Sequence, residues 1–208
     1  MSGTGLFISF EGIDGSGKST QARRLAENLR GAGRDVVLTR EPGGSEGAEE
    51  IRKLVLEGDP DRWSAETELL LFTAARRDHL ERLILPALEA GKLVICDRYA
   101  DSTRMYQGLR GAGLREKVDL LHDLMIGREP DLTVLVDMDP EEGLKRALAR
   151  QGSEERFEQF GADLQAQMRA GFLELAKAAP GRYVVVDGGH DEDTVAREIA
   201  GIVTSRLT

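Results

Sequence analysis

Residues 6–20 read LFISFEGIDGSGKST, an apolar run followed at once by a glycine-rich turn. Four residues of this stretch fit the phosphate-binding loop (P-loop) pattern G-x-x-x-x-G-K-[ST]: Gly12, Gly17, Lys18 and Ser19. Glycines let successive backbone N–H groups point inward at phosphate oxygens, and a helix that follows adds its positive end. A glycine-rich turn that is merely capped by serine is the alternative. The strand before the motif and the helix after it favour the phosphate site.

The sequence contains five apolar runs with many β-branched residues, and each predicts a strand. They lie at 6–10, 35–39, 93–97, 132–137 and 182–187. Segments with a 3.6-residue period predict helices between them, at about 18–32, 46–57, 65–90, 114–127, 139–150, 158–178 and 191–206. Strands that alternate with helices predict an α/β fold with a parallel sheet covered on both faces. No change of composition marks a linker, so we expect a single domain over residues 1–208.

The composition is that of a soluble globular protein, with 40 % hydrophobic and 31 % charged residues. A net charge of −9 argues against a general nucleic-acid binder, and the absence of an 18-residue apolar run argues against a membrane span. The first residues, MSGTGLFISFEG, carry no basic segment ahead of an apolar stretch, so we expect no signal peptide. The single cysteine, Cys96, is expected to be a buried thiol. We therefore expect a cytoplasmic protein.

A P-loop alone does not separate an enzyme from a GTPase switch. GTPases select guanine with an N-K-x-D element, whereas the only asparagine, Asn28, lies inside the first predicted helix. A small-molecule kinase remains, in which Lys18 would reach the β- and γ-phosphates of ATP and the Ser19 hydroxyl would ligate Mg²⁺. Asp97, at the end of a buried strand, could reach the Mg²⁺ shell through water. The candidate ATP-binding residues are Gly12, Ile13, Asp14, Gly15, Ser16, Gly17, Lys18, Ser19 and Thr20.

A kinase of this kind needs a second anion site, and Arg98 is suited to it. Arg98 follows Asp97 at a strand end, and ligands of open α/β sheets bind outside the carboxyl ends of the strands. A structural ion pair between Asp97 and Arg98 is the alternative, although adjacent strand residues point to opposite faces.

Phe72 and Arg76 lie four residues apart on one face of the helix predicted at 65–90. The ring could stack on a flat base, and the guanidinium could donate to a carbonyl of that base. The pattern alone favours a simpler arrangement, with Phe72 in the core and Arg76 on a solvated face.

Together these residues carry a family resemblance. Five stretches are similar, in order and spacing, to bacterial thymidylate kinases: GIDGSGKST (12–20), TREPGGSEGAEEIRKLVLEG (39–58), LLLFTAARRDHL (69–80), ICDRYADSTRMYQG (95–108) and ERFE (155–158). The resemblance spans essentially the whole chain. It implies the nucleoside-monophosphate-kinase fold, a three-layer sandwich whose five-stranded parallel sheet has the order 2-3-1-4-5. It also implies phosphorylation of dTMP to dTDP with ATP and Mg²⁺, and a homodimer formed through helices.

The resemblance assigns roles residue by residue. It implies that Phe72 stacks on thymine and that Arg76 donates to the 4-carbonyl oxygen. Arg52 and Arg98 would clamp the dTMP phosphate, and Tyr106 would crowd the 2′ position against a ribose. The implied substrate-binding residues, within a region at about 40–110, are Glu41, Pro42, Arg52, Phe72, Arg76, Arg98, Ser102, Thr103, Tyr106 and Gln107.

One departure from the family pattern indicates a subtype. Some members carry an arginine at the position of Gly15, whereas this chain has Arg150 and Arg156 in a loop expected to be a mobile lid at about 146–161. That pattern is similar to bacterial members whose lid supplies the catalytic cation; ordinary solvated arginines are the alternative. Arg150 would also stack on adenine of ATP. The implied catalytic residues are Asp14, Lys18, Arg98, Arg150 and Arg156.

Two points stay open. The pair Arg104-Met105 stands where relatives often have small residues ahead of YQG, which leaves the pocket entrance uncertain. The function could be that of a dTMP kinase, of a related kinase for UMP or dUMP, or of a nucleotide-binding regulator without turnover. Lys18, Asp97, Arg98 and the lid arginines together argue against a regulator, since a non-catalytic binder has no use for a mobile cation.

Overall fold

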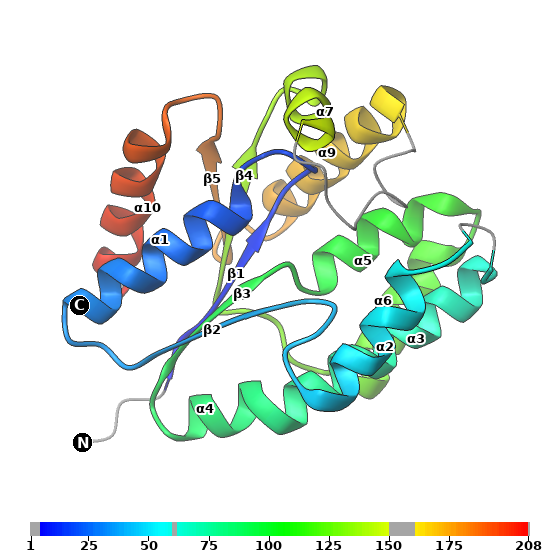
Figure 1. The fold of residues 1–208 in the computed structure, drawn as a ribbon, viewed down its shortest axis with the longest axis horizontal. Coiled ribbons are helices and arrows are strands. Elements are labelled where there is room, and N and C mark those ends of the chain that lie inside the picture. Colours follow the sequence, from blue (N-terminus) through cyan, green and yellow to red (C-terminus); the bar gives the residue numbers. More distant parts are fainter. Residues whose placement is uncertain (1–4, 60–61, 150–160, 208) are drawn as a thin grey trace.

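The computed structural model describes residues 5–59, 62–149 and 161–207, and its centre is a five-stranded parallel sheet (Figure 1). The strand order is β2-β3-β1-β4-β5, which confirms the predicted order and fold class. The strands are β1 (Phe7–Glu11), β2 (Val36–Arg40), β3 (Leu93–Asp97), β4 (Leu132–Asp137) and β5 (Tyr183–Asp187). Each begins within one residue of its predicted start.

Helices cover both faces of the sheet, as expected for parallel strands (Figure 1). They are α1 (Lys18–Gly31), α2 (Glu46–Leu56), α3 (Ala65–His79), α4 (Leu85–Glu89), α5 (Ala100–Tyr106), α6 (Leu114–Met125), α7 (Pro140–Leu148), α9 (Gly161–Ala178) and α10 (Glu192–Arg206). Apolar residues of α1 and α10 pack on one face. The other face is covered by two clusters, one built on α4 and β3 and one on α9 and β4.

The helix predicted at 65–90 is divided in the structure. A π-helical turn, η1 (Leu80–Ile84), separates α3 from α4, and the Leu85 N–H bonds to the Leu80 carbonyl across it. Pro86 follows directly; it has no N–H, and its ring would meet the carbonyl four residues earlier in a regular helix. The wider turn accommodates this proline while the helix continues.

Helix α5 was not predicted, because its sequence gives no helical signal. All seven of its residues, ADSTRMY, are buried, so no apolar stripe alternates with a polar face. The short 3₁₀ turn η2 (Gly108–Arg110) follows it. Missing α5 mattered, since this helix carries Ser102, Thr103 and Tyr106.

The carboxyl ends of the five strands lie at one edge of the sheet, because all strands are parallel. Four strands end there in an acid: Glu11, Asp97, Asp137 and Asp187. The P-loop leaves β1 at this edge and the Arg98 turn leaves β3 beside it, since β1 and β3 are neighbours. The polar residues of both predicted sites are therefore brought together.

Candidate active site

The P-loop connects β1 to α1, and its backbone is shaped for an anion. Gly12, Gly15 and Gly17 have φ of 145°, 75° and 94°, a region that residues with a Cβ rarely adopt. A Cβ on Gly15 would also lie 2.0 Å from the backbone oxygen of Gly143 in α7. Position 15 therefore has no room for an arginine, which gives a physical reason for the departure from other family patterns.

A cavity with about 670 Å³ of empty space lies against the P-loop. It is lined by Gly15, Ser16, Gly17 and Thr20 on one side and by the loop between β5 and α10 on the other, including His190 and Asp191. Within the described part of the chain, the buried Ser16 hydroxyl has no hydrogen-bond partner. The cavity thus offers inward-facing donors at a helix start, which is the environment a polyphosphate requires.

Lys18 of the P-loop and Asp97, at the end of the neighbouring strand β3, are the candidates for binding phosphate and metal. Lys18 is buried, and its Nζ donates to the Ile13 carbonyl at 3.0 Å, with Asp14 3.9 Å away. Asp97 Oδ1 is buried without a hydrogen-bond partner among the described residues. An unsatisfied carboxylate oxygen and the Ser19 hydroxyl are oxygen ligands of the kind that Mg²⁺ prefers, so these residues fit a magnesium ion.

Arg98 joins the P-loop to α5. Its guanidinium is ion-paired with Asp14 and donates to the Ser102 Oγ at 3.0 Å and the Tyr106 hydroxyl at 3.1 Å. Tyr106 in turn donates to Asp14 Oδ2 at 2.6 Å. Burial alone would raise the pKa of Asp14, but the charges of Arg98 and Lys18 outweigh burial and hold it below its usual value. Arg98 therefore forms its ion pair with Asp14. The alternative considered from the sequence, an ion pair between Arg98 and Asp97, is not what the structure shows.

A second cavity, with about 580 Å³ of empty space, is lined by Arg98. It brings together nine of the ten predicted substrate-binding residues: Glu41, Pro42, Phe72, Arg76, Arg98, Ser102, Thr103, Tyr106 and Gln107. Arg52 is the exception, and its Nη1 donates to the Pro42 carbonyl at 2.7 Å. Asp14, Leu56 and Tyr99 also line the cavity. We call this cavity the acceptor pocket.

Arg76 is buried in the acceptor pocket, so the simpler arrangement with a solvated Arg76 is wrong. Its Nε donates to Glu41 Oε2 at 2.7 Å and its Nη2 to Thr103 Oγ1 at 2.9 Å. Only 4 % of its surface is exposed. Phe72 lines the same pocket from one turn earlier on α3. The two side chains therefore present an aromatic face and a planar donor to one space.

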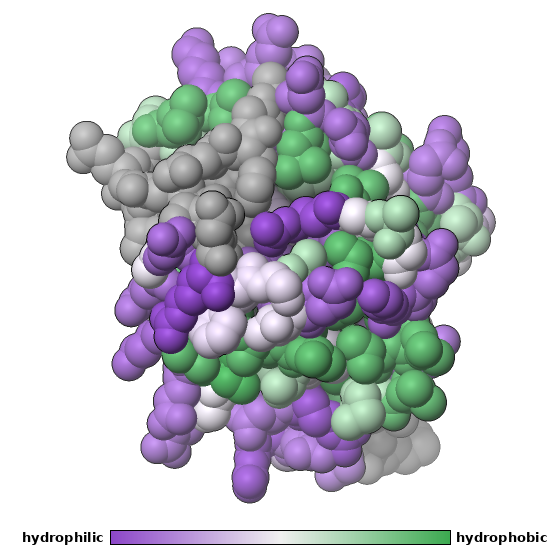
Figure 2. Space-filling view, turned by 90° about the vertical axis from the view of Figure 1, so that its right-hand side faces the viewer, coloured by the Kyte–Doolittle hydropathy of each residue, from purple (hydrophilic) through white to green (hydrophobic). Residues whose placement is uncertain are grey.

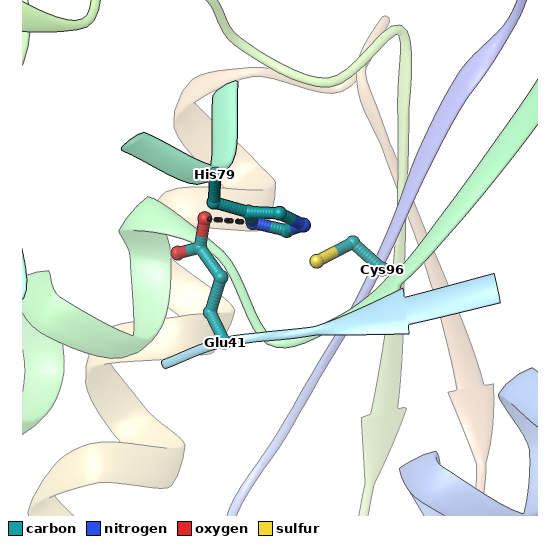
Figure 3. Close-up of side chains that lie close together, drawn as sticks. All are labelled: Glu41, His79 and Cys96. Carbon is teal, nitrogen blue, oxygen red and sulfur yellow. Dashed lines mark hydrogen bonds and ion pairs between the residues drawn. The ribbon is translucent and has the colours of Figure 1, made fainter. Parts of the chain in front are cut away.

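Behind Arg76 lies a buried group that the sequence did not single out (Figure 3). The fully buried His79 is 3.1 Å from Glu41 Oε1 through Nδ1, and its Nε2 is 2.8 Å from Thr39 Oγ1. Cys96 completes the group, and all three ligand atoms lie within 4.8 Å. Burial and the nearby acids raise the pKa of Cys96 well above its usual value, and its thiol donates to the Arg98 carbonyl. Because Arg76 already neutralises Glu41, we interpret the group as support for Arg76.

A phosphate-binding loop beside one cavity and an arginine of a second cavity that pairs with Asp14 of that loop indicate a phosphoryl transfer site, and comparison with known proteins decides the family. Residues 10–199 match the family model described as thymidylate kinase. The chain belongs to the thymidylate kinase family. It is 73 % identical to the thymidylate kinase of Ruegeria pomeroyi, over 100 % of this chain and 98 % of the relative. It is 66 % identical to that of Dinoroseobacter shibae, over 98 % and 99 %.

A solved thymidylate kinase structure gives the same result. The crystal structure from Ehrlichia chaffeensis matches with a TM-score of 0.75 at 37 % identity, covering 96 % of this chain and 98 % of that chain. Membership makes this protein an ATP-dependent nucleoside monophosphate kinase, a transferase. It does not favour the alternatives of a UMP or dUMP kinase or of a regulator without turnover.

Both lid arginines of this thymidylate kinase, Arg150 and Arg156, lie outside the described residues, as does most of the predicted lid at 146–161. Arg146, the first residue of the predicted lid segment, lines the P-loop cavity and donates to Glu142 at 3.0 Å. The pair Arg104-Met105 does not line the acceptor pocket. The Arg104 guanidinium contacts Asp101, Asp119 and Glu129, and Met105 is buried in the α9 cluster.

Sequence reasoning missed three further polar groups near Asp14. Gln165 of α9 donates to Asp14 Oδ2 at 3.3 Å, and Arg169 forms two hydrogen bonds, of 2.7 and 2.8 Å, with Asp137 at the end of β4. Glu11 ends β1 and is fully buried. Residues on α9 gave no signal beyond helical periodicity. Glu11 did give a signal in the sequence, because an acid at the end of a buried apolar strand needs hydrogen-bond donors or a cation to offset the cost of burial.

Proposed function

We propose that this chain phosphorylates dTMP to dTDP by holding ATP on the P-loop and dTMP in the acceptor pocket. The observation that carries the proposal is the position of Arg98. Its guanidinium contacts Asp14 of the P-loop on one side and Ser102 and Tyr106 of the acceptor pocket on the other. A cation between two anion sites is what in-line transfer between two phosphates requires.

On the donor side, Lys18 and the P-loop N–H groups would hold the β- and γ-phosphates of ATP. Ser19 and Asp97 would hold Mg²⁺, Asp97 through water, and the ion would neutralise phosphate charge. Asp14 would keep Arg98 in place and lie near the 5′ end of the acceptor. Support comes from the buried, unpartnered oxygen of Asp97 and from the buried Lys18.

On the acceptor side, Phe72 would stack on thymine while Arg76 donates to its 4-carbonyl oxygen. Thr103 and Gln107 would line the base and sugar, and Tyr106 would crowd a ribose 2′-hydroxyl. Each of these side chains lines the pocket. Arg98 and Arg52 would bind the phosphate of dTMP. Arg52 would then have to turn from the Pro42 carbonyl toward the ligand.

The lid proposal concerns the loop at about 146–161. Arg156 would approach the transferring phosphoryl group and Arg150 would stack on adenine, with closure excluding water that would otherwise hydrolyse ATP. We place the lid and the acceptor region within a single domain of residues 1–208. The packing of Gly15 against Gly143 supports this arrangement, because the P-loop itself leaves no space for a cation at position 15.

The experiment that tests this function is an ADP-release assay with ATP and Mg²⁺ over dTMP, dUMP, UMP, dCMP, dGMP and shikimate. Turnover that strongly favours dTMP supports the acceptor pocket as described. Equal turnover of UMP or dUMP would keep the chemistry and change the substrate. Normal ATP binding without turnover of any acceptor would contradict an enzyme.

We also propose a homodimer that forms through the helices on one side of the molecule. Four large apolar side chains of α3 and α6 are exposed, by 57 %, 58 %, 70 % and 47 %: Leu70, Leu120, Leu124 and Met125. Figure 2 views this side, and apolar residues form a band across it. Exposed apolar patches of this kind mark interaction surfaces. Sedimentation at micromolar concentration tests the proposal, and a monomer would contradict it.

Among the described residues, no helix is both long and apolar enough to cross a membrane. We propose the cytoplasm as the compartment. The support is that a chain with one cysteine has no disulfide framework and that its proposed substrates are ionised metabolites.

A further inference from the structure

Glu11 is a buried acid to which the proposed mechanism gives no role. It is the last residue of β1 and immediately precedes the P-loop. None of its surface is exposed, and it is not among the residues that line the acceptor pocket. Burying a carboxyl group is costly unless its oxygens are satisfied, so its partners show what it does.

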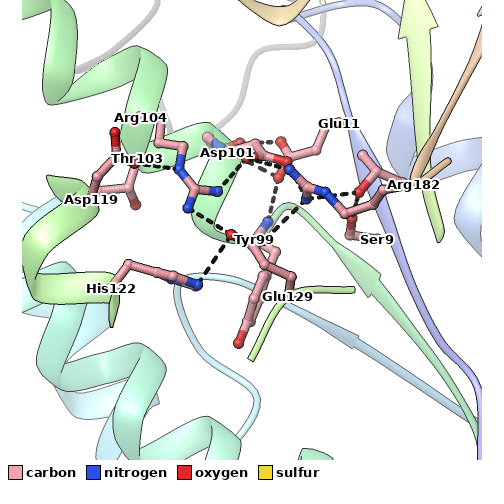
Figure 4. Close-up of polar contacts among 12 residues, drawn as sticks. Ser9, Glu11, Tyr99, Asp101, Thr103, Arg104, Asp119, His122, Glu129 and Arg182 are labelled. Carbon is pink, nitrogen blue, oxygen red and sulfur yellow. Dashed lines mark hydrogen bonds and ion pairs between the residues drawn. The ribbon is translucent and has the colours of Figure 1, made fainter. Parts of the chain in front are cut away.

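Those partners, Tyr99 and Ser102, lie at the start of α5. Figure 4 shows Glu11 beside Tyr99. Oε1 accepts from the backbone N–H groups of Tyr99 and Ser102, at 2.8 and 3.3 Å. Oε2 accepts from the Ser102 hydroxyl at 2.6 Å. The first N–H groups of a helix lack the usual partners four residues earlier; the Ser102 N–H also donates to the Tyr99 carbonyl at 3.1 Å, and Glu11 adds acceptors from another element. Glu11 thus attaches α5 to the central strand of the sheet.

Ser102 passes this contact on to Arg98. The same hydroxyl that donates to Glu11 accepts from Arg98 Nη1 at 3.0 Å. Arg98 has φ of 67°, a left-handed conformation that is strained for a residue other than glycine and persists only when its surroundings fix it. Its N–H donates to the Phe10 carbonyl, one residue before Glu11. Two residues of β1 therefore hold Arg98. Phe10 accepts from its backbone N–H, and Glu11 acts on its guanidinium through Ser102.

Burial, more than any neighbouring charge, determines the pKa of Glu11. Burial raises the pKa of Glu11 to about 8, and Asp101 on α5 contributes, while Arg98 acts in the opposite direction. Asp101 itself is bound by Arg104 and Arg182 (Figure 4). The Tyr183 hydroxyl also donates to Asp101. Cys96 on β3, Arg76 on α3 and Tyr183 on β5 also interact with the charge of Glu11.

We propose that Glu11 is a positioning residue for the phosphoryl acceptor: it fixes the first turn of α5, and through Ser102 it holds Arg98 where the acceptor phosphate binds. The inference rests on the proposed assignment of the acceptor pocket. It predicts an effect on dTMP that ATP does not share, because none of these contacts of Glu11 involves the ATP cavity.

The test compares two substitutions of Glu11. Glu11→Met keeps a similar volume and removes both acceptor oxygens, whereas Glu11→Gln keeps the shape and one acceptor oxygen. Ser9→Ala is the matched control, because Ser9 lies on the same side of β1, is fully buried, and is bonded to Thr133 Oγ1 at 2.9 Å. Folding is checked by thermal unfolding, and KM is determined separately for dTMP and ATP.

For Glu11→Met we expect kcat/KM for dTMP to fall roughly 10- to 100-fold, because the clamp is misplaced, while KM for ATP stays within about twofold. Glu11→Gln should restore most of the loss, and Ser9→Ala should behave as the wild type. Adding Ser102→Ala to Glu11→Met should cost less than the sum of the two single losses, since both act on one chain of contacts.

A folded Glu11→Met variant with unchanged constants, or with KM raised equally for both substrates, would overturn the inference. If Glu11→Met does not fold, Glu11→Asp decides by the same criterion, because its shorter side chain withdraws the carboxyl group from α5. Failure of the wild type to turn over dTMP would contradict the proposed function itself. Normal wild-type turnover with unaffected Glu11 variants would contradict only the positioning role.

Discussion

The P-loop cradle and the acceptor pocket are built in different ways. The cradle comes from nine consecutive residues, and its chemistry lies in the backbone, so glycine conformation and one lysine define it. The acceptor pocket draws side chains from four separate segments between Glu41 and Gln107 and from Asp14 of the P-loop, and holds them with buried ion pairs. A phosphate can be bound by local geometry, whereas a particular nucleotide is recognised by side chains that only tertiary packing brings together.

Arg98→Ala should have the largest effect, because Arg98 belongs to both regions. We expect kcat to fall by about 10³ or more, as for removal of a charged donor from a transferring phosphate, with ATP affinity nearly unchanged. Single-turnover kinetics and ATP titration measure the two quantities. Arg40→Ala, at the same edge of the sheet but half exposed and paired with Glu49, is the control. Activity within about tenfold of the wild type would remove Arg98 from the mechanism.

Arg76→Lys tests the acceptor pocket alone. Lysine keeps the charge but cannot donate in two directions to Glu41 and Thr103 as the guanidinium does. We expect kcat/KM for dTMP to fall roughly 10- to 100-fold through loss of base recognition, without a change in KM for ATP. Arg77→Lys, on the exposed side of the same helix, should be neutral. A parallel loss in both variants would point to helix stability instead.

Gly15→Ala tests the cradle. The left-handed φ and the contact with Gly143 should lower the free energy of unfolding by roughly 1–3 kcal/mol and weaken ATP binding. Gly201→Ala makes the same chemical change within α10, where a Cβ meets nothing within 4 Å. That variant should be more stable by about 0.5–1 kcal/mol. Urea unfolding measures both, and equal effects would show that the P-loop backbone is less constrained than its geometry implies.

The stability of the protein should also depend on pH. With the pKa of Glu11 raised to about 8 from an ordinary 4.5, the folded state holds this proton more tightly than the unfolded chain. The resulting stability is complete below pH 4.5 and is lost as pH rises through 8. Glu11→Gln cannot titrate, so its stability relative to the wild type should improve from about pH 5.5 to about pH 8.5. Urea unfolding at both values checks this; a constant difference would contradict it, and Ser9→Ala should show none.

The sequence predicted the cradle almost completely, because four residues within eight positions define it and β1 and α1 frame it. The acceptor pocket was harder to predict from the sequence. Whether Arg76 is buried depends on Glu41, 35 residues earlier, and helical spacing alone pointed to the wrong alternative. The resemblance supplied the pocket residues that periodicity could not. Helix α5 escaped prediction because a helix buried on every side has no amphipathic pattern.

The predicted strand order also came from the resemblance, since apolar runs show that strands exist and not which neighbours they take. Glu11 was present in the sequence as an unexplained acid at the end of an apolar strand. Its partners follow it by 88 and 91 residues, and no local pattern could have named them.

The left-handed backbone of Arg98 has a consequence for directed evolution of this protein. Glycine would adopt φ of 67° without strain, so Arg98→Gly should fold more stably than Arg98→Ala while neither retains the guanidinium. A screen that rewards heat resistance alone would therefore rank glycine above alanine at position 98, although neither residue can bind the acceptor phosphate. Libraries built on this chain need to select for turnover at that codon, because stability does not report the loss of the guanidinium.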